Sequence, residues 1–95
     1  PMRRPPVELP DESIEDLIKR LRRVEGQVRG IQAMLAEGRD CRDVVTQLSA
    51  ATRALEKTGF QLVAAGLTWC VEHPDEAIEE GFELADVQKM FLNLT

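Results

Sequence analysis

The stretch IEDLIKRLRRVEGQVRGIQAML, from Ile14 to Leu35, decides the fold. Its apolar residues alternate spacings of three and four positions: Ile14, Leu17, Leu21, Val24, Val28, Ile31 and Leu35. This is the heptad pattern of a helix that packs along its whole length on another helix. We expect Asp11 or Ser13 to cap its start, with Asp16 in a capping-box position, and Gly38 to end it.

A second helix is expected directly after this glycine. Asp40 is suited to cap it, and Asp43 lies in its first turn, where the helix dipole favours negative charge. Its apolar stripe consists of Cys41, Val44, Val45, Leu48, Leu55, Leu62, Val63, Leu67 and Cys70. Pro74 suits the first position of a third helix, which Gly81 interrupts. The sequence therefore predicts an all-α protein.

The composition agrees with one helical domain. The 95 residues include only one Trp, three Phe and no Tyr, and long β-branched runs are absent. Residues 1–10 hold four of the five prolines, which predicts a flexible N-terminal arm before a single domain over residues 11–95. No segment approaches the ~20 apolar residues that span a bilayer, so a cytoplasmic protein without membrane contact is expected. A core of this size is often completed by oligomerisation.

The net charge of −5 conceals an uneven distribution of basic residues. Nine of the twelve Lys and Arg residues precede residue 43, and the chain after residue 72 is mostly acidic. Lys19, Arg22 and Arg23 point away from the apolar seam, and Arg20 flanks it. Such a face suits nucleic acid, and Arg29, Arg53 and Lys57 would extend it. An ordinary solvated face balanced by Glu15, Asp16 and Glu25 is the alternative.

Cys41 and Cys70 are the candidate sensor thiols. Cys41 is expected in the first turn of the second helix, where unpaired backbone N–H groups, Arg39 and Arg42 favour a thiolate. Cys70 follows 29 residues later, close to eight whole turns, so both sulfurs lie on one side of the helix and roughly 43 Å apart. They meet only if two copies of this helix pack antiparallel about a two-fold axis. Otherwise Cys41 is a small core residue and the shared phase is a coincidence.

His73 follows Cys70 in a Cys-x-x-His spacing that suits two ligands of one metal ion. A histidine at this place also suits the C-cap of the second helix, so both roles stay open. No acid/base constellation or cofactor-binding loop is present, which argues against an enzyme. A helical protein-interaction module that never contacts DNA is a further hypothesis, because the chain is acidic.

The run RLRRVEGQVRGIQAMLAEGRDCRDVVTQLSA, from Arg20 to Ala50, resembles the copper-sensitive operon repressor family. The resemblance covers nearly the whole chain after the arm. It implies a three-helix protomer, a dimer built as an antiparallel four-helix bundle, and a dimer of dimers that binds operator DNA. It also implies the residues that contact DNA, which are Arg20 and Lys57, with Lys19, Arg22 and Arg23 on phosphates.

Family members that sense copper(I) use a Cys matching Cys41 and a His-x-x-x-Cys from the partner chain. Cys70 matches that second Cys, but Gly66 stands at the His position and cannot complete an S₂N site for a soft ion. A branch of the family that keeps both cysteines without this His senses persulfide and related reactive sulfur species.

The leading hypothesis is therefore a homotetrameric repressor that uses no cofactor. Reactive sulfur species would release it from operator DNA by linking Cys41 to Cys70 of the partner subunit as a disulfide or polysulfide. The alternative is a repressor of the same family that responds to copper(I) or zinc, bound by Cys41, Cys70 and His73.

Overall fold

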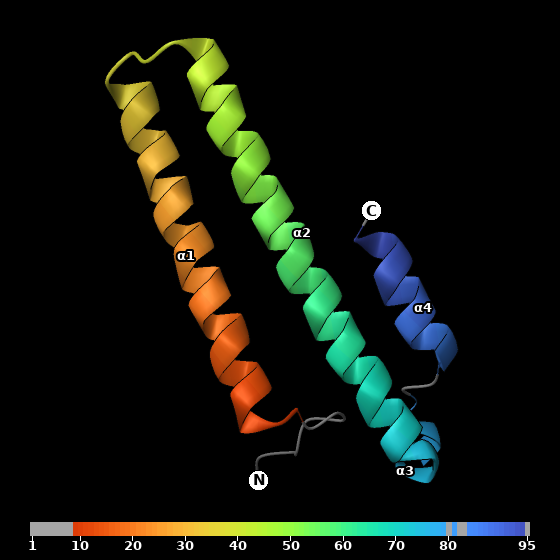
Figure 1. Cartoon of the computed structure of the whole chain (residues 1–95). Coiled ribbons are helices and arrows are strands. Elements are labelled where there is room, and N and C mark those ends of the chain that lie inside the picture. Colours follow the sequence, from red (N-terminus) through yellow and green to blue (C-terminus); the bar gives the residue numbers. More distant parts are fainter. Residues whose placement is uncertain (1–8, 80, 82–83, 95) are drawn as a thin grey trace, which may run out of the picture.

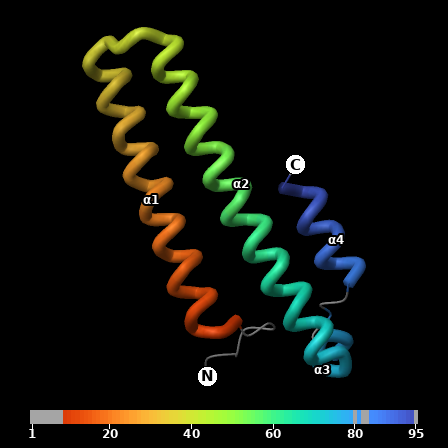
Figure 2. Tube along the Cα trace, in the orientation of Figure 1, coloured from red at the N-terminus to blue at the C-terminus, as the bar shows by residue number. Residues whose placement is uncertain are grey.

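The computed structural model describes residues 9–79, 81 and 84–94. These residues form four α-helices and no strand: α1 (Asp11–Ala36), α2 (Cys41–Glu72), α3 (Pro74–Glu79) and α4 (Leu84–Asn93). Figure 1 shows α1 and α2 as a long antiparallel hairpin, with α4 packed beside the C-terminal half of α2, on the side away from α1. The trace in Figure 2 shows that α3 makes the short turn between α2 and α4. The all-α prediction is confirmed, and the expected third helix is divided into α3 and α4 around Gly81.

The start of α1 differs from the prediction. Neither Asp11 nor Ser13 is the N-cap; Pro10 takes that position and makes no side-chain cap hydrogen bond. Its carbonyl instead accepts hydrogen bonds from the backbone N–H groups of Ser13 at 3.0 Å and Ile14 at 3.1 Å. Because the proline ring presets its own φ, the helix begins directly after it, two residues before the predicted capping box. Residues 1–8, most of the predicted arm, lie outside the described residues.

The turn between α1 and α2 is fixed by backbone chemistry. Gly38 has a φ of +72°, which a glycine adopts without steric cost. The N–H of Gly38 donates to the carbonyl of Leu35 at 3.2 Å, and the N–H of Arg39 donates to the carbonyl of Met34 at 3.0 Å. This pair of bonds is a Schellman motif. Asp40 then caps α2 by accepting a 2.8 Å hydrogen bond from the N–H of Arg42, so both predicted helix boundaries at this turn are confirmed.

The contact between α1 and α2 uses only part of the predicted seam. Val24 and Ile31 are buried on α1, and Ile31 shares a core cluster with Val44 and Ala51 of α2. The buried and half-buried positions define a contact side of each helix. On α1 these are Ser13, Leu17, Arg20, Val24, Gln27, Ile31 and Met34. On α2 they are Val44, Ala51 and the ones that share their heptad phase, which are Ala54, Thr58, Gln61 and Ala65.

The rest of the seam forms an exposed surface, which we call the apolar face. On α1 it consists of Ile14, Ile18, Leu21, Val28 and Leu35, and on α2 of Val45, Leu48, Leu55 and Leu62, all 40–63% exposed. Nearly all of these residues directly follow a contact-side residue, which rotates them by roughly 100° in one sense. Because the helices are antiparallel, the same sense leads to the same side of the hairpin on both. The predicted seam thus belongs to two surfaces, one of them without a partner inside the protomer.

A second core joins α2 to the C-terminal helices. Trp69, Cys70, Ala77 and Val87 are buried together, with Val63 packed against them. Farther along α4, the rings of Phe60 and Phe91 lie 5.1 Å apart. A Cβ on Gly59 would lie 2.6 Å from Cδ2 of Leu94, so the missing side chain lets α4 approach α2 closely. None of the described helices is both long and apolar enough to cross a membrane.

Candidate functional site

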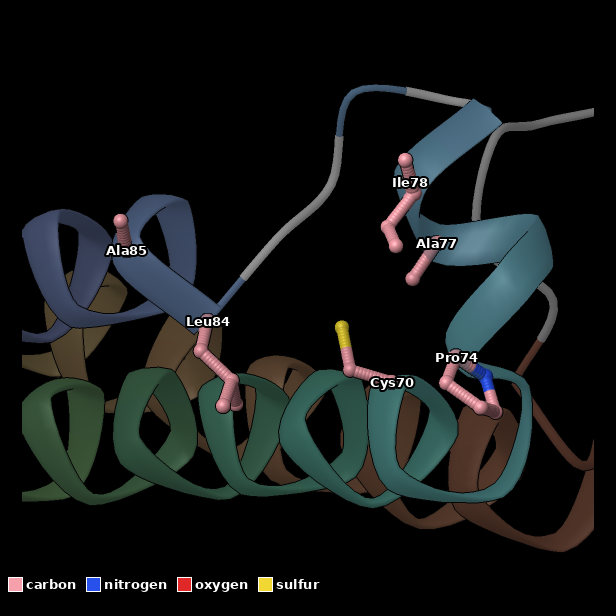
Figure 3. A pocket seen from close by; sticks show the side chains of 6 residues that line it. All are labelled: Cys70, Pro74, Ala77, Ile78, Leu84 and Ala85. Carbon is pink, nitrogen blue, oxygen red and sulfur yellow. The ribbon is translucent and has the colours of Figure 1, made fainter.

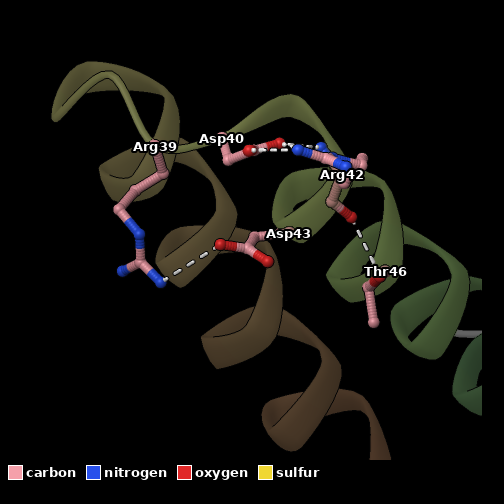
Figure 4. A network of polar contacts seen from close by, with 5 residues as sticks. All are labelled: Arg39, Asp40, Arg42, Asp43 and Thr46. Atoms are coloured by element: carbon pink, nitrogen blue, oxygen red, sulfur yellow. Dashed lines mark hydrogen bonds and ion pairs between the residues drawn. The ribbon is translucent and has the colours of Figure 1, made fainter.

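Cys41 is the first residue of α2 and is exposed to solvent. The arginines on either side of it are already paired with carboxylates, as Figure 4 shows. Nη2 of Arg42 lies 3.2 Å from Asp40, and Nη2 of Arg39 lies 3.9 Å from Asp43. The side-chain and backbone hydrogen bonds from Arg42 hold the pKa of Asp40 below its ordinary value. Both guanidinium groups are therefore directed at carboxylates, and an effect of the two arginines on the Cys41 sulfur stays a prediction.

Cys70 has the opposite environment. It is buried, and its Sγ points into a cavity of about 350 Å³ between α2, α3 and α4 (Figure 3). The other residues that line this cavity are Pro74, Ala77, Ile78, Leu84 and Ala85. Burial raises the pKa of the Cys70 thiol above its ordinary value, and the negative charge of Asp86 raises it further. The Cys70 thiol therefore loses its proton less readily than an ordinary cysteine, and it borders an apolar space that is large enough to admit another group.

The two thiols do not meet inside one protomer. They lie near opposite ends of the continuous helix α2, so the rise of an α-helix separates them by roughly 43 Å. Gly66, which replaces the imidazole implied by the family resemblance, is buried in α2. Across the described residues of a single chain, no three His, Cys, Asp or Glu side chains gather where they would hold a metal ion.

His73 is the C-cap of α2, which is one of the two roles left open by the sequence. Its backbone N–H donates to the carbonyl of Trp69 at 2.9 Å, and its Nδ1 lies 3.1 Å from the same oxygen. The imidazole also stacks on the Trp69 ring, with a centroid distance of 5.2 Å. These contacts fix the ring beside the Cys70 end of α2. A role for His73 as a metal ligand stays a prediction.

The predicted DNA-contacting residues differ in how they are paired. Arg20 is half-buried and forms a 2.9 Å ion pair with Asp16. The other four predicted residues are exposed and form no ion pair within the described part of the chain: Lys19, Arg22, Arg23 and Lys57. Four cations are therefore available to an outside partner.

Comparison with known proteins identifies the family. A family model described as metal-sensitive transcriptional repressor matches residues 13–92. The chain belongs to this family. The copper-sensing transcriptional repressor RicR of Mycobacterium tuberculosis is 47% identical to this family member over 72 residues, covering 76% of the chain and 72% of RicR. The copper-sensing transcriptional repressor CsoR of Bacillus subtilis is 37% identical over 83 residues, covering 81% of the chain and 79% of CsoR.

A solved structure supports the fold of this family member. The copper-sensing repressor CsoR with Cu(I) from Geobacillus thermodenitrificans NG80-2 is 37% identical and matches with a TM-score of 0.70. The match covers 93% of this chain and 91% of that structure. The resemblance seen in the sequence is thus confirmed at the level of the family, and the prediction that the protein is not an enzyme is confirmed by its repressor relatives.

One prediction about this repressor is wrong. The sequence interpretation gave the sensor no cofactor, because Gly66 removes an imidazole. The two relatives are copper sensors and the matching structure carries Cu(I), so the comparisons contradict an expectation of no metal. The error came from treating one missing donor as the loss of the whole site, although thiolates alone are good ligands for Cu(I).

Sequence reasoning also missed two features of the repressor's site. The cavity at Cys70 depends on how α3 and α4 fold back, which no local motif encodes. The influence of Asp86 on Cys70 crosses from α4 to α2. The period of α4 places Val87 on its packed side and so hints at its orientation, but nothing in the sequence indicates which part of α2 it covers.

Proposed function

We propose that this family member is a homo-oligomeric repressor that binds operator DNA and releases it when Cu(I) links Cys41 to Cys70 of the partner subunit. The observation that carries this proposal is the placement of the two thiols near opposite ends of the continuous helix α2, too far apart to act within a chain. An antiparallel partner would bring one end beside the other, and two-fold symmetry would make two equivalent sites.

The apolar face supports assembly with a second copy. It runs along both helices of the hairpin, so two hairpins joined through it form a four-helix bundle. The single domain over residues 11–95, the arm over residues 1–10 and the dimer of dimers belong to this proposal. So do the DNA contacts of Lys19, Arg20, Arg22, Arg23 and Lys57, and a cytoplasmic location.

The donor chemistry fits a soft metal ion. Cys41 and Cys70 of the partner subunit would hold the ion as two thiolates, and soft sulfur ligands select Cu(I). With Nδ1 near the Trp69 carbonyl, Nε2 of His73 is the ring nitrogen that remains for a third bond, which would also suit zinc. The bound ion would supply a link between two protomers. Cys70 must lose its proton to take part, so binding should strengthen as the pH rises.

The test is an anaerobic Cu(I) titration in competition with a chromogenic chelator, followed by operator binding measured by fluorescence anisotropy. We expect one ion per thiol pair and weaker operator binding by the loaded protein. Cys41→Ser and Cys70→Ser should each abolish both effects, whereas Arg29→Gln, a change remote from the thiols, should keep them. Unchanged operator affinity after stoichiometric loading would overturn the proposal.

Reactive sulfur species are a second candidate inducer, favoured by the buried glycine at position 66. In this chemistry the Cys41 thiolate attacks the outer sulfur of a low-molecular-weight persulfide and displaces its thiolate, which leaves a persulfide on Cys41. The thiolate of Cys70 from the partner subunit then attacks the inner sulfur of that group. An interchain disulfide forms and hydrosulfide leaves, so atoms and electrons balance.

Mass spectrometry of metal-free protein after treatment with glutathione persulfide distinguishes the two inducers. Sulfur sensing predicts a covalent dimer on non-reducing gels and its loss in either Cys→Ser variant. If the treated protein stays monomeric on those gels while Cu(I) still releases DNA, only the metal proposal stands.

A further inference from the structure

The side of the hairpin opposite the apolar face carries a second ordered surface. Its residues directly precede contact-side residues, so they are rotated by roughly 100° in the other sense. On α1, Lys19 precedes Arg20 and Arg23 precedes Val24. On α2, Arg53 precedes Ala54 and Lys57 precedes Thr58. We call the surface made by Lys19, Arg23, Arg53 and Lys57 the basic face.

The register of the hairpin brings these four cations to the same level. In an antiparallel hairpin, residues that are equally many positions from the turn lie at the same level. Counted from Ala36 on α1 and Cys41 on α2, Lys19 lies level with residue 58, and Arg23 lies level with residue 54. Each helix therefore contributes two cations to a compact group, one turn apart. Arg53, which the family resemblance did not assign to DNA, is as exposed and unpaired within the described chain as the other three.

Carboxylates flank this surface: Glu15 and Glu56 lie one turn from Lys19 and Arg53 on the outer side of their helices. Asp16 precedes Leu17 on α1 and is paired with Arg20 at 2.9 Å. Asp43 precedes Val44 on α2 and is paired with Arg39 at 3.9 Å. Glu25 directly follows Val24 and pairs with Arg29, so it belongs to the other side of α1. Between Lys19 and the hairpin turn, the positions of α1 in this phase are exposed and none of them is a carboxylate.

Two glycines continue the line of the basic face along α1. Gly26 precedes Gln27 and Gly30 precedes Ile31, in the same phase as Lys19 and Arg23. A Cβ at either position would meet nothing within 4 Å in the protomer. A glycine inside a helix costs about 0.5–1 kcal/mol relative to alanine. Packing inside the protomer does not require these glycines. They nevertheless lower the stability of α1, the helix that makes the longest contact of the fold.

We propose that the basic face seats the sugar–phosphate backbone of duplex DNA, and that Gly26 and Gly30 let this backbone lie directly against α1. The inference rests on the proposed DNA binding and adds Arg53 and both glycines to it. Four unpaired cations supply the attraction to phosphates, which is the dominant sequence-independent part of DNA binding. The missing side chains of the two glycines leave space against α1. The backbone N–H groups there already form hydrogen bonds within the helix, so they supply no further donors. The basic and apolar faces lie on opposite sides, so DNA and a second protomer can bind together.

The experiment measures stability and operator affinity in the same variants of the full chain. Gly26→Ala and Gly30→Ala should raise Tm, because alanine is the better helix former and meets no neighbour. Each should also weaken operator binding on the order of tenfold, equivalent to about 1.4 kcal/mol. Gln88→Ala is the control, because Gln88 is an exposed residue of α4 that lies outside the basic face. Arg53→Gln should reduce the salt dependence of binding by about one phosphate contact, unlike Lys89→Gln, which removes an exposed cation of α4.

Sedimentation velocity on each variant checks that assembly is unchanged. A higher Tm with unaltered operator affinity in both glycine variants would overturn the close approach of DNA to α1. Equal effects of Arg53→Gln and Lys89→Gln would overturn the position of the basic face. Wild-type protein that binds no DNA at low salt, but does bind polyglutamate, would instead refute the proposed function itself and show an acidic protein as the partner.

Discussion

The two cysteines of α2 differ in their exposure to solvent and in their neighbours. Cys41 is exposed at the start of α2, whereas Cys70 is buried under α3 and α4 beside a carboxylate. A thiolate attacks electrophiles and binds metals, whereas a thiol does neither well. In the proposed mechanism, the exposed Cys41 would meet an inducer first and the buried Cys70 would complete the link. Both residues were proposed from the sequence, whereas the difference in their burial follows from tertiary packing.

The influence of Asp86 can be measured directly in a Cys41→Ser background. Asp86→Asn removes a negative charge near Cys70, which should stabilise the thiolate and lower the Cys70 pKa. The pH profile of Cys70 alkylation by iodoacetamide should then shift to lower pH, with a faster rate at any fixed pH below the plateau. Asp75→Asn, an exposed change in α3, is the control and should leave the profile in place. A profile that moves to higher pH in the Asp86 variant would contradict this reading.

Helix ends were predictable wherever a local residue sets them. Gly38 and Asp40 carry their own conformational signals, and the structure uses both. The start of α1 was misjudged because Pro10 and the acidic residues after it offer several competing caps. The seam was also misread, since periodicity shows which residues are apolar but not which neighbour each one faces. Leu21 and Val24 belong to one heptad pattern and to two different surfaces.

The hairpin turn yields a stability prediction. Gly38→Ala forces a Cβ into a left-handed conformation and should lower the free energy of unfolding by about 1 kcal/mol, although no atom lies within 4 Å of it. Urea denaturation followed by circular dichroism measures the change. Gly30→Ala, which lies in regular helix, is the matched control and should stabilise. Equal shifts in the two variants would show that the turn is not held by its backbone angle.

At the scale of the whole molecule, the protomer leaves much of its apolar surface uncovered. The α1–α2 hairpin exposes leucines and valines along one side, which is unusual for a surface that meets only water. The small core and the shared phase of Cys41 and Cys70 predicted association with a second copy, but only the family resemblance implied a four-helix-bundle dimer and a dimer of dimers. The all-α fold was predictable without the resemblance, because helix caps, glycines and heptad spacing all indicate the same helices.

A charge placed on the apolar face tests the assembly. Leu55→Glu should shift the protein toward the monomer in sedimentation velocity, because a carboxylate would be buried without a partner. Val71→Glu is the control, since Val71 is 69% exposed and lies outside that face. Operator binding should fall together with assembly in the first variant. If both variants sediment as wild type does, the apolar face is not the contact between protomers.

The unbroken length of α2 has a mechanical consequence. One stiff rod of 32 residues carries a thiol near each end and Arg53 and Lys57 close to its middle. In the proposed dimer, two α2 helices linked through Cys41 and Cys70 at both ends would no longer rotate freely against each other. A small change in the length of that link would then change the angle at which the two helices cross. The cationic surfaces mounted on the rods would then turn relative to one another. Because the phosphates of DNA have a fixed spacing, this rotation would move the cations away from them and weaken binding.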